Sequence, residues 1–279
     1  MFDCHTHVFG PGHVGGAALE AVKRVWGEKY EMKALPEENY ECVKKCVGAI
    51  VLAFDAPATG MIVPNEYVAE YTSKFLDKLF GFASVDPNKW NAPSLLEYAV
   101  KELGLKGLKL APFYQNFYPD GKKHFPLYAK AAELNIPILW HQGTSFIPEG
   151  FLEASRPAAL DPIAREFPHL KMIIAHMGHP WIGECISVVR KNTNMYMDLS
   201  ALGTRSWQYY NAMVLAKEYG VLNKILFGSD YPFFTSEETK ESLYQINHLV
   251  EGTNMPRILN SEIEAIVHRN TPELLGLVK

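Results

Sequence analysis

The chain has 279 residues, of which 48% are hydrophobic and 21% are charged, the balance of a globular protein with a sizeable core and not of a disordered one. A net charge of −4, without any long run of Lys and Arg, argues against nucleic acid as a partner. The start of the sequence lacks the basic flank and apolar stretch of a signal peptide, and no apolar run approaches a membrane span, so we expect a cytoplasmic protein without a membrane partner.

Short apolar runs alternate along the chain with segments of helical periodicity. Runs that are apolar throughout are typical of a parallel sheet covered by helices. About eight such units predict an α/β fold, a closed (β/α)8 TIM barrel that forms a single domain over residues 1–279. The predicted strands are residues 2–8, 47–54, 79–85, 105–111, 136–141, 170–176, 195–200 and 224–228. The predicted helices are residues 67–77, 94–103, 125–134, 159–167, 181–191, 208–219 and 237–250.

The alternative architecture is an open, doubly wound sheet. Such a sheet usually carries a Gly-rich phosphate loop after its first strand, whereas the first strand here ends in histidines. Neither GxGxxG nor the P-loop lysine motif occurs, which argues against a nucleotide-binding enzyme. Residues 10–41 predict a long first loop, with one helix at 17–26 that lies over the barrel mouth. The four cysteines form no CxxC pair, and we expect reduced, buried thiols.

The motif Asp-Cys-His-Thr-His at residues 3–7 carries the strongest chemical signal. Side chains two positions apart on a strand share one face, so His5 and His7 project together and can chelate one metal ion. Asp3 lies one step down on the same face, where its carboxylate can fix the tautomer of an imidazole. The alternative is two chance histidines near a frayed terminus.

Other ligand-type residues recur at the ends of later predicted strands. His141 ends the run 136–141, His176 ends the run 170–176, and Asp230 follows the run 224–228. Taken singly, His141 is explained as a core histidine and Asp230 as the start of a turn. Taken together, they predict one shared site, because all carboxyl ends of the strands in a closed barrel surround one mouth. Burying such polar groups without partners would be costly.

These residues resemble the amidohydrolase-related family, a branch of the amidohydrolase superfamily of metal-dependent TIM-barrel enzymes. The family includes hydrolases, lactonases and nonoxidative decarboxylases similar to aminocarboxymuconate-semialdehyde decarboxylase. The resemblance runs from Asp3 to about Gly276. Besides the first motif it is carried by Gly-Leu-Lys-Leu-Ala-Pro (107–112), His-Gln-Gly (141–143), Ala-His-Met-Gly-His-Pro-Trp (175–181), Met-Asp-Leu-Ser (197–200), Leu-Phe-Gly-Ser-Asp-Tyr-Pro (226–232) and Asn-Thr-Pro-Glu-Leu-Leu-Gly (270–276).

The resemblance implies how the site residues divide their roles. It implies that His176 points at substrate or bound water as an acid or base. As a mechanistic hypothesis, we expect Asp230 to take the proton of the activated water. His179 either contacts the substrate and takes part in catalysis, or supports the start of the next helix. The resemblance further implies one divalent metal ion, zinc with manganese also used, held by His5, His7, His141 and Asp230.

Lys109 is the residue whose role the resemblance leaves most open. In other branches of the superfamily a carboxylated lysine on the fourth strand bridges two metals, which would make the site binuclear. In this family the matched lysine is not generally a bridging ligand, so we expect Lys109 to contact a substrate anion or to have a structural role. The family motif commonly has His where this chain has Ala111, and this departure leaves the fourth wall of the pocket undefined.

Two reactions fit the implied site. In the first, the metal lowers the pKa of water to about 7, and the activated water attacks the carbonyl of an amide, ester or lactone. In the alternative, the same metal binds an aromatic or dienyl carboxylic acid that loses carbon dioxide. A metal-binding module without catalysis is a third possibility, and removal of the metal separates it from an enzyme because a structural site would unfold.

Aromatic residues in the loops after the predicted strands suit a planar or apolar small-molecule substrate. The alternatives are incidental surface aromatics or the interface of a homodimer. Arg156 and Arg205 lie in the same loops and either bind a substrate carboxylate or are solvated. The loop aromatics are Phe113, Tyr114, Phe117, Tyr118, Phe146, Trp181, Trp207, Tyr231, Phe233 and Phe234.

Overall fold

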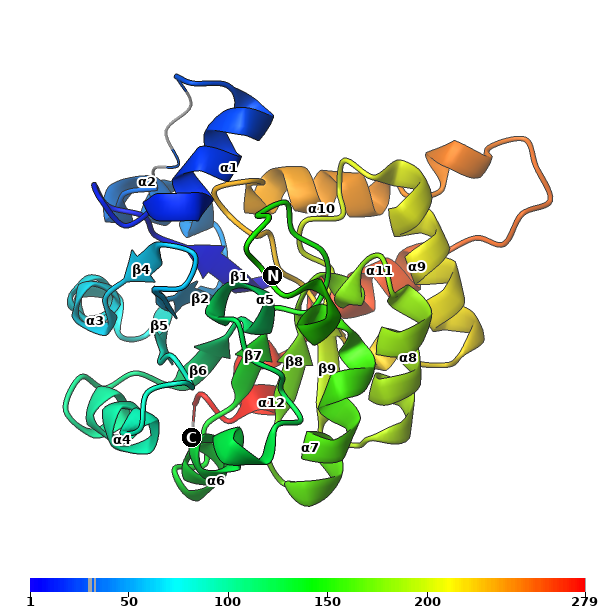
Figure 1. Ribbon diagram of the computed structural model, residues 1–279. Helices are drawn as coiled ribbons and strands as arrows, with labels where there is room; N and C mark the ends of the chain where they lie inside the picture. The colour runs from blue at the N-terminus through cyan, green and yellow to red at the C-terminus, as the bar shows by residue number, and fades with distance from the viewer. Residues whose placement is uncertain (30–31, 33, 279) are drawn as a thin grey trace.

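The computed structural model describes residues 1–29, 32 and 34–278, and among them eight parallel strands form one sheet in chain order. Each strand falls inside one of the eight predicted runs. Figure 1 shows these strands at the centre of the molecule, with helices around them. The strands are β1 (Phe2–His7), β2 (Gly48–Leu52), β5 (Leu79–Ser84), β6 (Gly107–Leu110), β7 (Ile138–Trp140), β8 (Met172–Ile174), β9 (Met195–Asp198) and β10 (Ile225–Leu226).

The first and last strands of the sheet meet through the backbone that follows β10. The N–H of His7 donates to the carbonyl of Tyr231 (2.9 Å). In return, the N–H of Asp230 donates to the carbonyl of His5 (2.8 Å). These bonds bring the end of β10 beside β1 and complete the ring of strands, so the predicted (β/α)8 TIM barrel is confirmed.

The strands are buried on both faces, which explains their continuous apolar sequence. Val51 of β2 packs in the core between the sheet and the helices, whereas its neighbour Leu52 packs in a second core inside the barrel. Gly107 of β6 makes room in this interior, because a Cβ there would lie 2.4 Å from the ring of Phe82. The barrel is therefore a packed core, and chemistry is confined to its mouth.

The helices between the strands pack against the outside of the sheet (Figure 1). Segment 237–250 is not one helix as predicted, because it divides into α10 and a 3-10 helix (His248–Val250). At the break, the side chain of Asn247 donates to the carbonyl of Ile258 (2.7 Å) and accepts from its N–H (3.0 Å), which competes with helical bonding. The helices that pack outside the sheet are α3 (Asn65–Thr72), α4 (Ala92–Lys101), α6 (Phe125–Glu133), α7 (Asp161–Glu166), α8 (Ile182–Lys191), α9 (Ser206–Glu218) and α10 (Ser236–Tyr244).

Several elements lie outside the predicted set. The second predicted strand extends to residue 54, but β2 ends at Leu52 and Phe54 begins a separate antiparallel hairpin. The other unpredicted elements are short, so their hydrophobic pattern covers too few periods to be recognised. The hairpin is formed by β3 (Phe54–Ala56) and β4 (Met61–Val63), and the helices are α2 (Pro36–Val43), α5 (Pro112–Gln115), α11 (Asn260–Val267) and α12 (Thr271–Leu275).

Helix α1 (Gly16–Trp26) crosses the barrel mouth, as predicted for residues 17–26. The ring of Trp26 lies 5.1 Å from that of Phe146, after β7, and 5.5 Å from that of Phe233, after β10. The guanidinium of Arg24 also donates to the carbonyl of Phe146 (2.6 Å). Helix α1 is thereby tied to loops on two sides of the mouth. Residues 30, 31 and 33 of the predicted first loop lie outside the described residues.

The four cysteines are free thiols, and the prediction that they are buried holds for Cys4, Cys46 and Cys185. Cys42 is only half-buried. Within the described part of the chain, no helix combines the length and the apolar composition needed to cross a membrane.

Candidate active site

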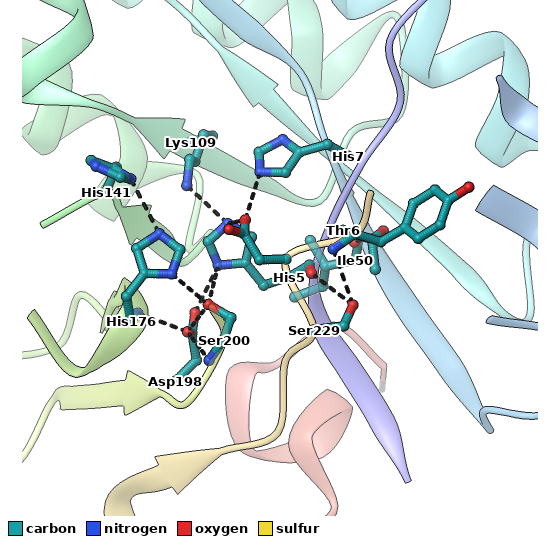
Figure 2. A network of polar contacts seen from close by, with 12 residues as sticks. His5, Thr6, His7, Ile50, Lys109, His141, His176, Asp198, Ser200 and Ser229 are labelled. Carbon is teal, nitrogen blue, oxygen red and sulfur yellow. Dashed lines mark hydrogen bonds and ion pairs between the residues drawn. The ribbon is translucent and has the colours of Figure 1, made fainter. Parts of the chain in front are cut away.

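His5 and His7 extend from β1 toward one cluster of polar side chains, as their spacing predicts (Figure 2). Nε2 of His5 and Nε2 of His7 each lie 3.3 Å from Oδ1 of Asp230. The side chains of the two histidines are 0% and 7% exposed, and that of Asp230 is 11% exposed. Two imidazoles from the first strand and a carboxylate from the segment after the last strand thus meet at the closure of the barrel.

Asp3 does not hold an imidazole, contrary to the prediction. Its Oδ1 accepts from the backbone N–H of His5 (3.2 Å) and of Ser229 (3.0 Å). Its Oδ2 accepts from the hydroxyl of Ser236 (2.6 Å). Asp3 therefore joins β1 to the segment after β10 and fixes the backbone from which His5 and Asp230 project.

His141 and His176 follow β7 and β8 and reach the same cluster. Nε2 of His176 lies 3.2 Å from Nδ1 of His141, and the ring of His176 stacks on that of His5 at a centroid distance of 4.9 Å. Ligand atoms of His5, His176 and Asp230 all lie within 4.8 Å of one another. The structure therefore groups His176 with His5 and Asp230 at distances that suit one shared ion, a group that includes neither His7 nor His141.

Left-handed backbone concentrates near this cluster. Four residues after β8, β9 and β10 have positive φ without being glycine: His176 (57°), Met177 (48°), Ala201 (60°) and Asp230 (68°). Each such conformation costs about 1–3 kcal/mol and is kept where the surrounding structure enforces it, often at functional sites. Two of these strained residues, His176 and Asp230, belong to the cluster itself.

Lys109 of β6 is buried beside the histidines, with 1% of its surface exposed. Its Nζ lies 3.3 Å from Nε2 of His5. Burial lowers the pKa of Lys109 to about 8, although the nearby carboxylates of Asp230 and Asp198 raise it. The ammonium group lies inside the polar cluster, where its charge offsets that of the two carboxylates.

Asp198 and Ser200, at the end of β9, are two site residues that the sequence alone does not single out. Oδ2 of Asp198 lies 2.9 Å from Nδ1 of His5, and Oγ of Ser200 lies 2.7 Å from Nδ1 of His176. Both side chains are completely buried. The signal that could have found them is their spacing, because two polar residues two apart at a strand end share a face, as His5 and His7 do.

The donor set fits a divalent metal ion. Burial lowers the pKa of His5, His7 and His141 well below the usual value, so each imidazole is neutral and has a lone pair to offer. Nε2 of His141 is buried without a hydrogen-bond partner among the described residues, which is costly unless another group satisfies it. Imidazoles together with one carboxylate are ligands that zinc commonly takes.

Asp230 supplies the carboxylate of this set. Burial raises its pKa to about 6, while the neighbouring His176 and Lys109 lower it. The group is therefore ionised at neutral pH, yet its pKa lies close enough to neutrality for it to exchange a proton. A carboxylate with these properties suits both metal binding and proton transfer.

A pocket of about 620 Å³ opens above the cluster. Its lining includes His141, His176 and Asp230, so the polar groups face the space in which a substrate would lie. A smaller chamber of about 60 Å³ continues beneath α1 to His7 and Lys109. The aromatic residues of the main pocket are Trp26, Tyr114, Phe146, Phe233 and Phe234.

The predicted loop aromatics divide by position. Tyr114, Phe146, Phe233 and Phe234 line the pocket, as expected for a planar substrate. Phe113 and Phe117 are buried in the core, and Tyr118 and Trp207 are exposed at 49% and 60%. Trp26, at the end of α1, completes the wall and is not among the predicted loop aromatics, because its place there depends on how α1 packs against Phe146 and Phe233.

Two of the three predicted substrate contacts outside the cluster line the pocket. His179 is buried, and its Nδ1 has no hydrogen-bond partner among the described residues. Burial, aided by Arg205, lowers the pKa of His179 to about 4, so its imidazole is neutral. The residue that caps α8 is Trp181, so His179 does not start that helix. Arg205 lies at the exposed rim and donates to the carbonyl of Ala201 (2.5 Å).

Arg156 lies elsewhere. Its guanidinium pairs with Glu184 and lies 5.9 Å from the centre of the Trp181 ring. It is not among the described residues that line the pocket or the chamber. The geometry therefore gives no support to Arg156 as a substrate contact.

Comparisons with known proteins agree with this fold. An uncharacterized TIM-barrel protein from Bordetella bronchiseptica has a TM-score of 0.74 at 19% identity, with 99% of this chain and 98% of that chain covered. A probable 2-pyrone-4,6-dicarboxylic acid hydrolase from Acinetobacter baumannii, solved with citric acid bound, has a TM-score of 0.68 at 17% identity, with coverage of 99% and 98%.

A dihydroxybenzoic acid decarboxylase from Polaromonas, solved with manganese and the inhibitor 2-nitroresorcinol, has a TM-score of 0.66 at 17% identity, with coverage of 99% and 96%. No curated protein matches the chain in sequence. The family model described as Amidohydrolase matches residues 2–277, nearly the whole chain. The solved structures that share the fold thus include a hydrolase and a decarboxylase, and the chain belongs to the amidohydrolase family of metal-dependent enzymes.

Proposed function

We propose that the protein is a zinc-dependent hydrolase that cleaves an ester, lactone or amide bond in a small planar carboxylic acid. The observation that carries this proposal is the position of the Asp230 carboxylate, 3.3 Å from two neutral imidazoles and open to a pocket with aromatic walls. The residues that would hold the metal are His5, His7, His141 and Asp230. A bound divalent cation acts as a Lewis acid that polarises an oxygen atom and eases its deprotonation.

The protein groups would carry the protons. Asp230 accepts the proton of a water molecule as the water oxygen forms a bond to the carbonyl carbon of the substrate. As the bond between this carbon and the leaving oxygen or nitrogen breaks, the protonated Asp230 returns this proton to the leaving atom, directly or through His176. Lys109 stabilises the negative charge that develops on the substrate, because its ammonium group is already held within the cluster.

The pocket supports a flat, acidic substrate. Tyr114, Phe146 and Phe233 offer ring faces, and Arg205 at the rim can bind a carboxylate in a bidentate manner. The unpartnered Nδ1 of His179 offers one more polar contact in the wall. The probable 2-pyrone-4,6-dicarboxylic acid hydrolase shares the fold, and a ring ester with carboxylates is the kind of molecule this lining suits.

A second candidate is the nonoxidative decarboxylation of an aromatic carboxylic acid. It is favoured by the two cations near the ring-binding space, Lys109 and Arg205, which suit a carboxylate placed directly beside the cluster. In this reaction a proton would pass to the ring carbon as the bond to the carboxylate breaks and carbon dioxide leaves. The decarboxylase from Polaromonas, which has the same fold, acts on an acid of this kind.

One experiment separates the two reactions. Protein loaded with zinc, and in parallel with manganese, is offered pyrone and other lactone carboxylates, amides, and hydroxybenzoates in water enriched in oxygen-18. The hydrolase predicts one heavy oxygen in the product without release of carbon dioxide. Release of carbon dioxide from a carboxylate, without heavy oxygen in the ring product, would select the decarboxylase instead. Higher activity with manganese than with zinc would contradict the assignment of the metal.

Three further expectations remain predictions. They are that residues 1–279 fold as a single domain, that the protein is cytoplasmic, and the alternative that the loop aromatics form the interface of a homodimer. The mass of the purified protein in solution tests the last of these, and limited proteolysis tests the first.

A further inference from the structure

The carboxylate of Asp198 is the buried centre of a hydrogen-bond network that reaches several histidines (Figure 2). Its Oδ1 accepts from the backbone N–H of His176 (2.9 Å) and of Ser200 (3.1 Å). Because backbone N–H groups can only donate, Oδ1 is an acceptor. The hydroxyl of Ser200 lies 2.5 Å from the same Oδ1 and must therefore bring its own proton to this bond.

This carboxylate also fixes the position of the proton on His5. Nδ1 of His5 lies 2.9 Å from Oδ2 of Asp198, while its Nε2 lies 3.3 Å from Nζ of Lys109. An ammonium group donates, so Nε2 accepts, and the single proton of the neutral ring is on Nδ1. Nε2 of His5 consequently faces Asp230 as a bare lone pair.

The network continues through Ser200 to His176. The only proton of the Ser200 hydroxyl goes to Asp198, so its oxygen accepts from Nδ1 of His176 at 2.7 Å. The proton of His176 is thus on Nδ1, and its Nε2 accepts from Nδ1 of His141 at 3.2 Å. Nε2 of His141 is then the bare nitrogen of that ring, and it is the atom left without a hydrogen-bond partner among the described residues.

We infer that Asp198, directly and through Ser200, is the positioning residue that sets which ring nitrogen carries the proton in His5, His176 and His141. It leaves Nε2 of His5 and of His141 bare, which are the atoms a metal ion needs. Ser200 is the second positioning residue, because it alone connects Asp198 to the rings of His176 and His141. This inference rests on the proposed function only in taking those nitrogens as metal ligands.

Nitrogen-15 NMR of the histidine rings in the metal-free protein tests this directly, since a protonated and a bare ring nitrogen have different chemical shifts. We expect Nδ1–H for His5, His141 and His176 in the unaltered chain. A resonance for Nε2–H on His5 or His176 would overturn the inference, and this spectrum needs no variant.

Two variants then test separately the direct bond from Asp198 to His5 and the path from Asp198 through Ser200 to His176. In Asp198→Asn, the amide oxygen replaces Oδ1 and the amide NH2 donates to Nδ1 of His5, which moves the ring proton to Nε2. We expect zinc affinity, measured by competition with a chelator, to fall about 10- to 100-fold. In Ser200→Ala, His5 keeps its proton on Nδ1, and we expect His176 and His141 to become mixtures of tautomers.

Asp161→Asn, which removes a carboxylate partner of Lys191 outside the site, is the matched control. We expect it to leave the zinc affinity and the tautomers of the histidine rings unchanged.

The outcomes distinguish this inference from the proposed function. Unchanged zinc affinity and an unchanged His5 tautomer in Asp198→Asn would overturn the role of Asp198. An unchanged His176 ring in Ser200→Ala would overturn that of Ser200. If the unaltered chain shows the expected tautomers but binds no zinc, the proposed function fails while the positioning of the rings stands.

Discussion

At the scale of single residues, the positions of His5, His7 and Asp230 follow from two simple rules. Alternation along a strand places His5 and His7 on one face, and closure of the barrel brings the segment after β10 beside them. Both rules act on the sequence itself, so the cluster could be predicted. What the sequence cannot separate is the role of each histidine, because His141 and His176 both end strands in the same way.

His176 is the residue whose role can be tested most simply. As an acid or base it contributes to turnover and not to metal binding, so His176→Asn should keep one zinc per chain and lose about 10²- to 10⁴-fold in kcat. Metal content by mass spectrometry and steady-state kinetics measure the two effects. His124→Asn, at a buried histidine that lines neither the pocket nor the chamber, is the control and should keep kcat. Loss of zinc in His176→Asn would instead make His176 a ligand, a role its distance to His5 and Asp230 also permits.

Lys109 gives a second test at this scale. Its ammonium group lies 3.3 Å from Nε2 of His5 and repels any cation that binds there. We expect Lys109→Met to bind zinc about tenfold more tightly, which corresponds to roughly 1.4 kcal/mol, while losing turnover. Zinc titration against a chelator measures this. Weaker zinc binding by Lys109→Met would contradict this expectation and show that Lys109 is a metal ligand. Loss of a second bound metal ion in this variant would show the same.

The roles of other residues could not be predicted from the sequence, because their partners are set by tertiary structure. Arg156 was predicted to bind a substrate carboxylate because it lies in a loop after a strand. In the structure its guanidinium already pairs with the carboxylate of Glu184 from α8. Asp198 and Ser200 lie in a segment that the family resemblance includes, yet their function depends on rings supplied by β1 and by the segment after β8. Long-range contacts of this kind leave no periodic signal.

At the scale of elements, most strands were predictable because they are buried on both faces and read as continuous apolar runs, whereas β1 was recognised by its histidine motif. The hairpin of β3 and β4 was not, since it has only three residues in each strand and follows β2 almost directly. Helix α1 was predicted over the mouth, but the contribution of Trp26 to the pocket depends on contacts with Phe146 and Phe233 from distant loops.

Helix α1 should therefore affect substrate binding more than chemistry. Trp26→Ala removes a wall of the pocket that does not belong to the polar cluster, so we expect KM to rise about tenfold and kcat to change less than about threefold. Trp26→Phe, which keeps an aromatic ring, should retain most of the affinity. Steady-state kinetics on the substrate found by screening decides this, and a fall in kcat with unchanged KM would contradict it.

At the scale of the whole molecule, the barrel interior limits what the fold tolerates. A Cβ at Gly107 would lie 2.4 Å from the ring of Phe82, so Gly107→Ala should lower the free energy of unfolding by about 1–3 kcal/mol through overpacking. Urea denaturation measures the change. Gly183→Ala in α8 is the matched control, because a Cβ there meets no atom within 4 Å, and stability should stay or rise slightly. Equal losses in the two variants would contradict a packed interior.

The position of a bound ion is the most direct test of the proposed metal centre. Crystals of the protein soaked with zinc would be measured by anomalous diffraction at the zinc edge, and we expect one peak at the barrel mouth within bonding distance of His5, His7, His141 and Asp230. A peak at another place, or a peak at the mouth that touches His176 and neither His7 nor His141, would contradict the proposed metal centre.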